Sequence, residues 1–179
     1  MEIIDNVKDR GLIGKNLKLI ISDDYGAIKS AVKFSFLNIP LQLCITYKLR
    51  NTISKVKHKN KRQVADDLKP VFNQETKQEA ENQAKMFCKK WYLIEPKAVE
   101  TFRNNLDYCF TYYQFPKEIW HKIRTSNAIE REFRELRRRI KIFDNSFNSI
   151  FSTKNYANTI FTNLNQNYPY SNPKLHTNY

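Results

Sequence analysis

The chain has 179 residues, of which 41% are hydrophobic and 13% aromatic, so it can build a packed core and global disorder is not expected. Its net charge of +13 favours a polyanionic partner, for which nucleic acid is the commoner choice and an anionic membrane surface the alternative. No apolar run approaches the roughly 20 residues that span a bilayer, and the charged start MEIIDNVKDRG does not resemble a secretory signal, so the predicted location is cytoplasmic.

The first part of the chain predicts a strand, a helix and a second strand. Residues 16–22, NLKLIIS, end in a short apolar run that predicts a strand, and the acidic turn DDYG follows it. Ile28, Val32 and Phe36 then recur at a spacing of four, which predicts a helix with one buried face. Residues 41–46, LQLCIT, alternate apolar and polar side chains and predict the second strand. We therefore expect one βαβ unit over residues 16–46.

Residues 48–62, KLRNTISKVKHKNKR, contain seven Lys and Arg side chains and no acidic one. Two interpretations stay open: a solvated helix face or loop, or a surface that follows DNA phosphates. The second makes Lys48, Arg50, Lys55 and Lys57 candidate DNA-binding residues.

The central part of the chain, within 48–120, predicts helices. All three glycines lie in the first 26 residues, whereas sheets with tight hairpins usually have glycine in their turns, so we expect the rest to be largely helical. Helically spaced apolar residues mark two core stripes. These are Ala80, Ala84, Phe87 and Trp91 in the first, and Val99, Phe102, Leu106 and Phe110 in the second.

The segment 121–143 predicts a basic amphipathic helix. Ile129, Phe133, Leu136 and Ile140 form its apolar stripe, which predicts the buried face. Its arginines are candidate DNA-binding residues: Arg124, Arg131, Arg134, Arg137, Arg138 and Arg139.

Two acidic positions can have either a structural role or a role in a catalytic site. Asp23 follows the first strand, where open α/β sheets often place site residues, but Asp23 or the adjacent Asp24 could instead cap the next helix. Glu130 could complete a capping box with Asn127 or pair with Arg134 one turn later.

The remaining features suggest no further site. The three cysteines are far apart, and neither they nor the histidines have a zinc-binding spacing, so we expect reduced, packed thiols. Residues 144–179 are rich in asparagine and predict a partly disordered segment with one weak helix around 154–164, KNYANTIFTNL.

Several segments of the chain resemble those of a known family and occur in the same order. ISDDYGAIKSAVKFSF, CITYKLRN and KKWYLIEPKAVETFRNNLDYCFTYYQFPKEIWHKIRTSNAIEREFRELRRR together resemble Mutator-type transposases, over about residues 8 to 142. That resemblance implies an RNase H-like core with an Asp-Asp-Glu triad and a helical insertion before the Glu. In that alignment Asp23 matches the second aspartate and Glu130 matches the glutamate.

The resemblance also implies a fold and a division of the chain. The fold class is α/β, predominantly helical, with a partial RNase H-like core (strand–Asp–helix–strand) and an all-helical insertion before the Glu-bearing helix. Residues 1–47 would be the remaining part of the core and 48–120 the basic tract and insertion. Residues 121–143 would close the core, and 144–179 would form the asparagine-rich end.

The implied activity is DNA transposition by metal-dependent phosphodiester cleavage and strand transfer. Asp23 and Glu130 would bind Mg²⁺ or Mn²⁺, since Mg²⁺ prefers oxygen ligands. The implied partners are double-stranded DNA at transposon terminal inverted repeats and a second copy of the chain or full-length transposase.

The chain departs from the family at three places. The family's first aspartate lies upstream of the segment that begins here, its glycine after the second aspartate is Asp24, and Tyr47 replaces the histidine of its Cys-x-x-His word. We therefore expect a copy truncated at its N-terminus and inactive as a single chain. The alternative function is a non-catalytic DNA-binding or dimerising remnant that interferes with full-length transposase.

Overall fold

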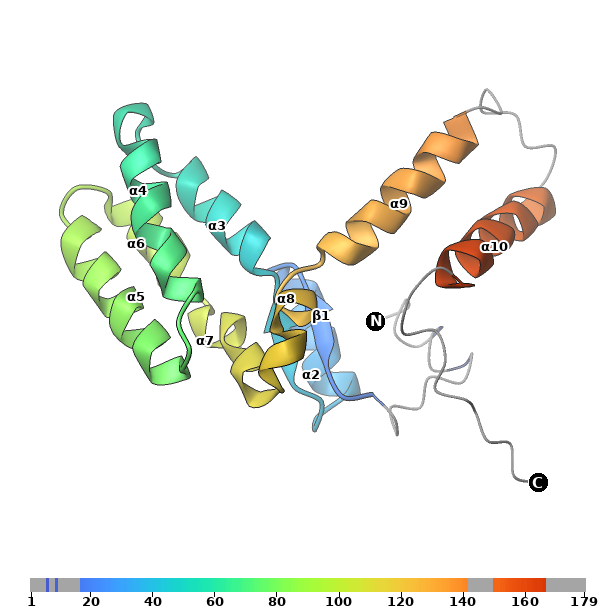
Figure 1. Ribbon diagram of the computed structural model, residues 1–179, viewed down its shortest axis with the longest axis horizontal. Helices are drawn as coiled ribbons and strands as arrows, with labels where there is room; N and C mark the ends of the chain where they lie inside the picture. The colour runs from blue at the N-terminus through green and yellow to red at the C-terminus, as the bar shows by residue number, and fades with distance from the viewer. Residues whose placement is uncertain (1–5, 7–8, 10–16, 142–149, 167–179) are drawn as a thin grey trace. The chain divides into compact units, whose positions relative to one another are not determined.

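The structure is a computed structural model that describes residues 6, 9, 17–141 and 150–166 (Figure 1). The chain forms two compact units, Met1–Ser126 and Asn127–Tyr179. Each unit is described here by itself.

The first unit begins with the predicted strand–helix–strand arrangement. Strand β1 (Ile20–Ser22) pairs in parallel with β2 (Leu41–Leu43), and helix α2 (Gly26–Ser35) connects them. Ile20 lies opposite Leu41 and Ser22 opposite Leu43, so both carboxyl ends lie at the same edge of the sheet. The prediction of a parallel βαβ unit is confirmed.

The second strand is shorter than predicted, because a helix begins where the alternating sequence continues. Cys44 is the N-cap of α3 (Ile45–Ser54), and its carbonyl accepts the first helical hydrogen bond from the Lys48 amide. The prediction of a strand through 46 is therefore wrong. Alternation over six residues suggested one exposed face, yet all of Leu41–Leu43 is buried.

Gln42, the polar residue within β2, is completely buried and fully hydrogen-bonded. Its Nε2 donates to the Leu43 carbonyl at 2.7 Å and the Cys109 carbonyl at 3.0 Å, and its Oε1 accepts from the Tyr112 amide at 2.7 Å. A buried amide is tolerated when its donors and acceptors are paired in this way. These bonds hold the small sheet against the helices that follow.

The rest of the first unit is helical, as predicted. Its elements are η1 (His58–Asn60), α4 (Lys61–Leu68), η2 (Lys69–Phe72), α5 (Lys77–Trp91), α6 (Pro96–Arg103), α7 (Leu106–Cys109), η3 (Thr111–Gln114), η4 (Lys117–Ile119) and α8 (Trp120–Ile123). Helix α5 begins at a capping box in which Thr76 and Glu79 exchange side-chain-to-backbone hydrogen bonds. Helix α6 begins with Pro96, whose missing N–H costs nothing in the first turn.

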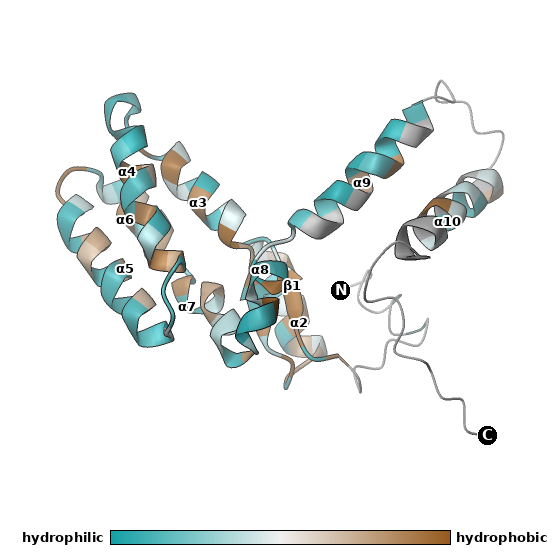
Figure 2. Cartoon of the chain, viewed as in Figure 1, coloured by the Kyte–Doolittle hydropathy of each residue, from teal (hydrophilic) through white to brown (hydrophobic). Residues whose placement is uncertain are grey.

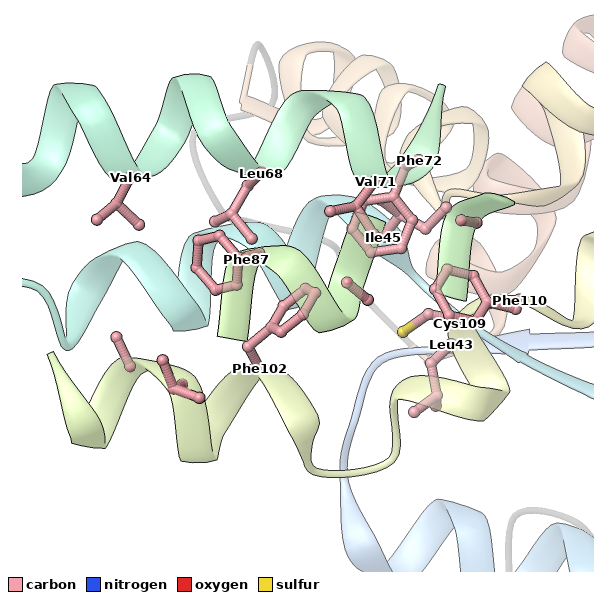
Figure 3. Packing of buried hydrophobic residues seen from close by; sticks show 14 of the residues in the cluster. Leu43, Ile45, Val64, Leu68, Val71, Phe72, Phe87, Phe102, Cys109 and Phe110 are labelled. Atoms are coloured by element: carbon pink, nitrogen blue, oxygen red, sulfur yellow. The ribbon is translucent and has the colours of Figure 1, made fainter. Parts of the chain in front are cut away.

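The core of this unit lies among α3, α4, α5 and α6 and contains the predicted apolar stripes (Figure 3). Phe87 and Phe102 meet edge to face with ring centroids 4.8 Å apart, and Phe102 also contacts Phe72 at 6.4 Å. The buried side chains of the α5 stripe and the buried Phe102 and Phe110 confirm both stripes.

The second stripe does not lie on one helix, contrary to the sequence prediction. Helix α6 ends at Arg103, and α7 begins after Asn105, whose φ of 56° is left-handed. Asparagine tolerates this conformation better than most residues. The chain therefore turns at Asn105, a residue that also enters the candidate site.

The three cysteines are free, and burial raises the pKa of Cys109 to about 12. The thiol therefore keeps its proton in the folded state at a pH where the unfolded chain loses it. The contribution of the protonated Cys109 thiol to the free energy of unfolding is fully present below pH 9 and is lost as pH rises from 9 toward 12.

We accordingly expect Cys109→Ala to reduce the loss of stability between pH 8 and pH 10, by on the order of 1 kcal/mol. Urea unfolding of wild type and variant at both pH values measures this difference. An identical pH dependence of stability in the two proteins would contradict the raised pKa of Cys109.

The second unit contains two described helices, α9 (Asn127–Ile140) and α10 (Ile150–Gln166), which contact each other. Helix α10 includes the weak helix predicted at 154–164 and extends it at both ends. The remaining parts of the asparagine-rich segment, 144–149 and 167–179, lie outside the described residues. In the ranges that the structure describes, no helix is both long and apolar enough to cross a membrane.

Candidate active site

Asp23 lies directly after β1, at the edge where both strands end. Its side chain is exposed, and among the described residues its carboxylate has no hydrogen-bond or ion-pair partner. Tyr25 is the N-cap of α2, with no side-chain capping bond, so the alternative that Asp23 or Asp24 caps this helix is wrong. The Asp23 carboxylate is therefore accessible at this edge of the sheet.

Asp24 has a different environment, because its carboxylate is bonded on both oxygens. Oδ2 accepts from Lys48 Nζ at 2.8 Å, and Oδ1 accepts from Asn105 Nδ2 at 2.8 Å. Lys29 Nζ donates to the Asn105 Oδ1 at 2.7 Å, which extends the network to α2. The turn that carries Asp23 is thus fixed to α3 and to the α6–α7 junction.

Lys48, a predicted DNA-binding residue, is only 2% exposed. Besides Asp24, its ammonium donates to the Asn104 carbonyl at 2.6 Å and the Thr101 carbonyl at 3.4 Å. A buried ammonium needs such acceptors, since burial without them is costly. Lys48 is therefore a structural residue in this chain and does not belong to the exposed cations.

An open groove of about 1000 Å³ lies along this network. It is lined from α3 by Lys48 and Asn51, from α6 by residues including Val99 and Arg103, and at its ends by Asp24 and Tyr92. The groove thus runs from the turn after β1 to the turn between α5 and α6.

The segment just before α9 is anchored at the carboxyl end of β2. The backbone N–H and the hydroxyl of Ser126 each donate to Cys44 Sγ at 3.3 Å, and the Ile45 amide donates to the Arg124 carbonyl at 3.0 Å. Arg124 also donates from Nη1 to the Phe72 carbonyl at 3.0 Å. Sequence reasoning missed the contact of Cys44 with Ser126, since only the fold brings the two residues together.

Glu130 lies in the first turn of α9, in the second unit, and is partly buried. Asn127, predicted as the N-cap, is the first helical residue. Phe133 is 46% exposed, so the predicted burial of the apolar stripe is wrong at this position.

The arginines of α9 are largely exposed. Arg131, Arg134 and Arg137 are exposed, as is Arg138, which forms an ion pair with Glu135 at 2.8 Å. The hydrogen bond and charge of Glu135 raise the pKa of Arg138. Arg139 belongs to α9, but its side chain lies outside the described residues.

The Lys and Arg side chains of the basic tract from Arg50 onward are also exposed. Arg50 lies with its guanidinium 5.7 Å from the Tyr47 ring centroid, and Lys55 and Lys57 are exposed. Lys59, Lys61 and Arg62 continue the exposed cations, although the sequence prediction did not single them out. Among the residues that the structure describes, no three His, Cys, Asp or Glu side chains are grouped as a metal site.

Comparison with known proteins decides the family. Residues 1–171 match the family described as "Transposase, Mutator family". The chain belongs to the Mutator family of transposases. The resemblance on which Asp23 and Glu130 were chosen is therefore confirmed at the level of the family.

Individual Mutator-family relatives match over most of this chain. It is similar to the transposase for insertion sequence element IS406 of Burkholderia multivorans (30% identity over 78% of this chain) and to that for IS905 of Lactococcus lactis (26% over 78%). It is also similar to the transposase for IS256 in transposon Tn4001 of Staphylococcus aureus (29% over 94%). The chain spans 36%, 35% and 43% of these relatives, less than half their length.

Proposed function

We propose that this chain forms part of the catalytic region of a DNA transposase that cleaves phosphodiester bonds and transfers strands. The observation that carries the proposal is the exposed carboxylate of Asp23 at the carboxyl edge of β1 and β2, which has no hydrogen-bond or ion-pair partner in the described part of the chain. The parallel β1–α2–β2 arrangement, followed by helices and then by the Glu130-bearing α9, supports an RNase H-like core with a helical insertion.

The carboxylates of Asp23 and Glu130 are the residues that would bind Mg²⁺ or Mn²⁺. Asp23 fits this role because its side chain is exposed and no described residue bonds its carboxylate, whereas both carboxylate oxygens of Asp24 are already bonded. When bound, such ions favour attack of a hydroxyl at phosphorus and departure of the leaving oxygen. The Asp24–Lys48–Asn105 network would hold the Asp23 turn in position for that role.

The proposed partner is double-stranded DNA at transposon terminal inverted repeats. The exposed cations Arg50, Lys55 and Lys57 of the basic tract and Arg131, Arg134 and Arg137 of α9 would bind its phosphates. We further propose that the chain works with a second copy or with full-length transposase.

A salt titration tests the DNA-binding part of the proposal. We expect the logarithm of the affinity for duplex DNA to fall linearly with the logarithm of salt concentration, with a slope of roughly −0.9 per phosphate contact. The double variant Lys55→Ala/Lys57→Ala should reduce that slope by about 2. Lys117→Ala, which removes an exposed lysine paired with Glu75 outside the basic tract, is the control and should leave the slope unchanged. A wild-type affinity independent of salt would contradict the proposal.

A second candidate function is DNA binding without cleavage, which would interfere with full-length transposase. The observation that favours it is that Arg50, Lys55 and Lys57 are exposed and lie far from both carboxylates in the sequence. It predicts that Asp23→Asn and Glu130→Gln change neither DNA affinity nor interference. The first proposal instead requires both carboxylates for cleavage.

A further inference from the structure

The turn between α5 and α6 exposes three consecutive large apolar side chains, Tyr92, Leu93 and Ile94. Leu93 is 89% exposed, and Figure 2 shows this turn in brown between the two helices. The turn is well held, since the amides of Ile94 and Glu95 both donate to the Trp91 carbonyl. Single exposed apolar residues are ordinary, but three together on a fixed turn indicate a contact surface.

Glu95 fixes this apolar turn against the basic turn between α3 and α4. Its carboxylate is buried, with the residue 3% exposed, and accepts from the Lys57 amide at 3.3 Å on both oxygens and from Asn60 Nδ2 at 2.8 Å. These side-chain bonds of Glu95 therefore all reach the basic turn. The two turns form one surface, the basic–apolar tip, defined as residues 55–62 and 92–94.

The tip is positively charged and contains no Asp or Glu. Its exposed cations are Lys55, Lys57, Lys59, Lys61 and Arg62. In Figure 2 the α3–α4 turn is hydrophilic, while the α5–α6 turn is hydrophobic. An apolar side chain beside several phosphate-binding cations is the combination with which proteins insert a wedge between base steps of duplex DNA.

We propose that the basic–apolar tip contacts duplex DNA, with its cations on phosphates and Leu93 inserted in the groove against a base step. This inference rests on the proposed DNA-binding function and deepens it. Duplex DNA is favoured over a membrane surface because the chain belongs to a family of transposases.

Leu93→Ser tests the wedge, with Met86→Ser as matched control, since Met86 is an exposed apolar residue on α5 outside the tip. The probe is a duplex with 2-aminopurine at several adenine positions, whose fluorescence rises when bases unstack. Wild type and Met86→Ser should raise the fluorescence and bind equally well. Leu93→Ser should abolish the rise and weaken binding about tenfold, as expected for loss of one buried leucine. Equal melting temperatures check that the exposed substitutions leave the fold intact.

Three other results would overturn the inference in distinguishable ways. If wild type binds the duplex and Leu93→Ser matches it in both measurements, the wedge is wrong and the proposed function stands. If wild type does not bind duplex DNA at all, the proposed DNA binding fails as well. If Leu93→Ser loses binding only to vesicles containing phosphatidylserine and keeps its DNA affinity, the tip is a membrane contact.

Discussion

Replacing Lys48 with methionine is expected to lower the free energy of unfolding by about 3 kcal/mol. The methionine keeps the apolar stem but removes the buried ammonium, so Asp24 loses its charge partner and the Asn104 carbonyl loses a 2.6 Å donor. Breaking a buried ion pair from one side is costly because the other charge stays behind. Urea unfolding followed by circular dichroism measures the change.

The control for this variant is Lys57→Met, which replaces an exposed lysine and should change stability by less than about 0.5 kcal/mol. Combined with Asp24→Asn, Lys48→Met should cost clearly less than the sum of the two single variants, because the residues interact directly. Strictly additive losses would show that the pair does not stabilise the Asp23 turn.

In the proposed assembly of two copies of the chain, replacing Asp23 with asparagine is expected to reduce Mg²⁺-dependent plasmid nicking by about a hundredfold or more, equivalent to roughly 3 kcal/mol of barrier. Stability should be unchanged, because the Asp23 side chain is exposed and has no partner among the described residues. DNA affinity should be retained, since removing a negative charge does not weaken phosphate binding. Glu130→Gln should have the same effect on nicking.

Asp107→Asn, at an exposed carboxylate on α7, is the matched control and should nick DNA like wild type. Nicking by Asp23→Asn at the wild-type rate would contradict the metal-binding role of Asp23. A wild-type chain that binds DNA but does not nick it would instead support the second candidate, binding without cleavage.

The sequence was sufficient to predict the elements whose signal is local. Apolar spacing predicted α2 and the buried faces of α5 and α6, and the short apolar runs located β1 and β2. The ends of elements were less predictable, because Cys44 begins a helix and Asn105 reverses the chain through a left-handed conformation. Neither event has a strong local signal.

The role of Lys48 could not be predicted from its sequence neighbours. It begins a run of cations and therefore looked like the exposed residues Lys55 and Lys57 that follow it. Its partners, Asp24 and Asn104, are distant in sequence. The packing of α3 against α6 brings Asn104 to Lys48, and the pairing of β1 with β2 brings the turn with Asp24 to the start of α3. Long-range contacts of this kind decide which cations of a basic tract are buried.

The same network accounts for one departure from the family sequence. By the resemblance described for the sequence, Asp24 stands where the family has glycine after its second aspartate, so this chain has a carboxylate beside the candidate catalytic aspartate. The bonds from Lys48 and Asn105 compensate that carboxylate and direct it away from the role of Asp23. Two adjacent aspartates thus have separate functions, one structural and one proposed to bind metal.

Iron-directed hydroxyl-radical cleavage of the protein tests the central claim most directly. Fe²⁺ takes the place of Mg²⁺, and ascorbate with peroxide then generates radicals that cut the polypeptide beside the bound ion. With duplex DNA present, we predict cuts next to both Asp23 and Glu130, which excess Mg²⁺ suppresses and Asp23→Asn abolishes. Cuts at only one of the two positions, or cuts that persist in Asp23→Asn, would contradict a metal site shared by these carboxylates.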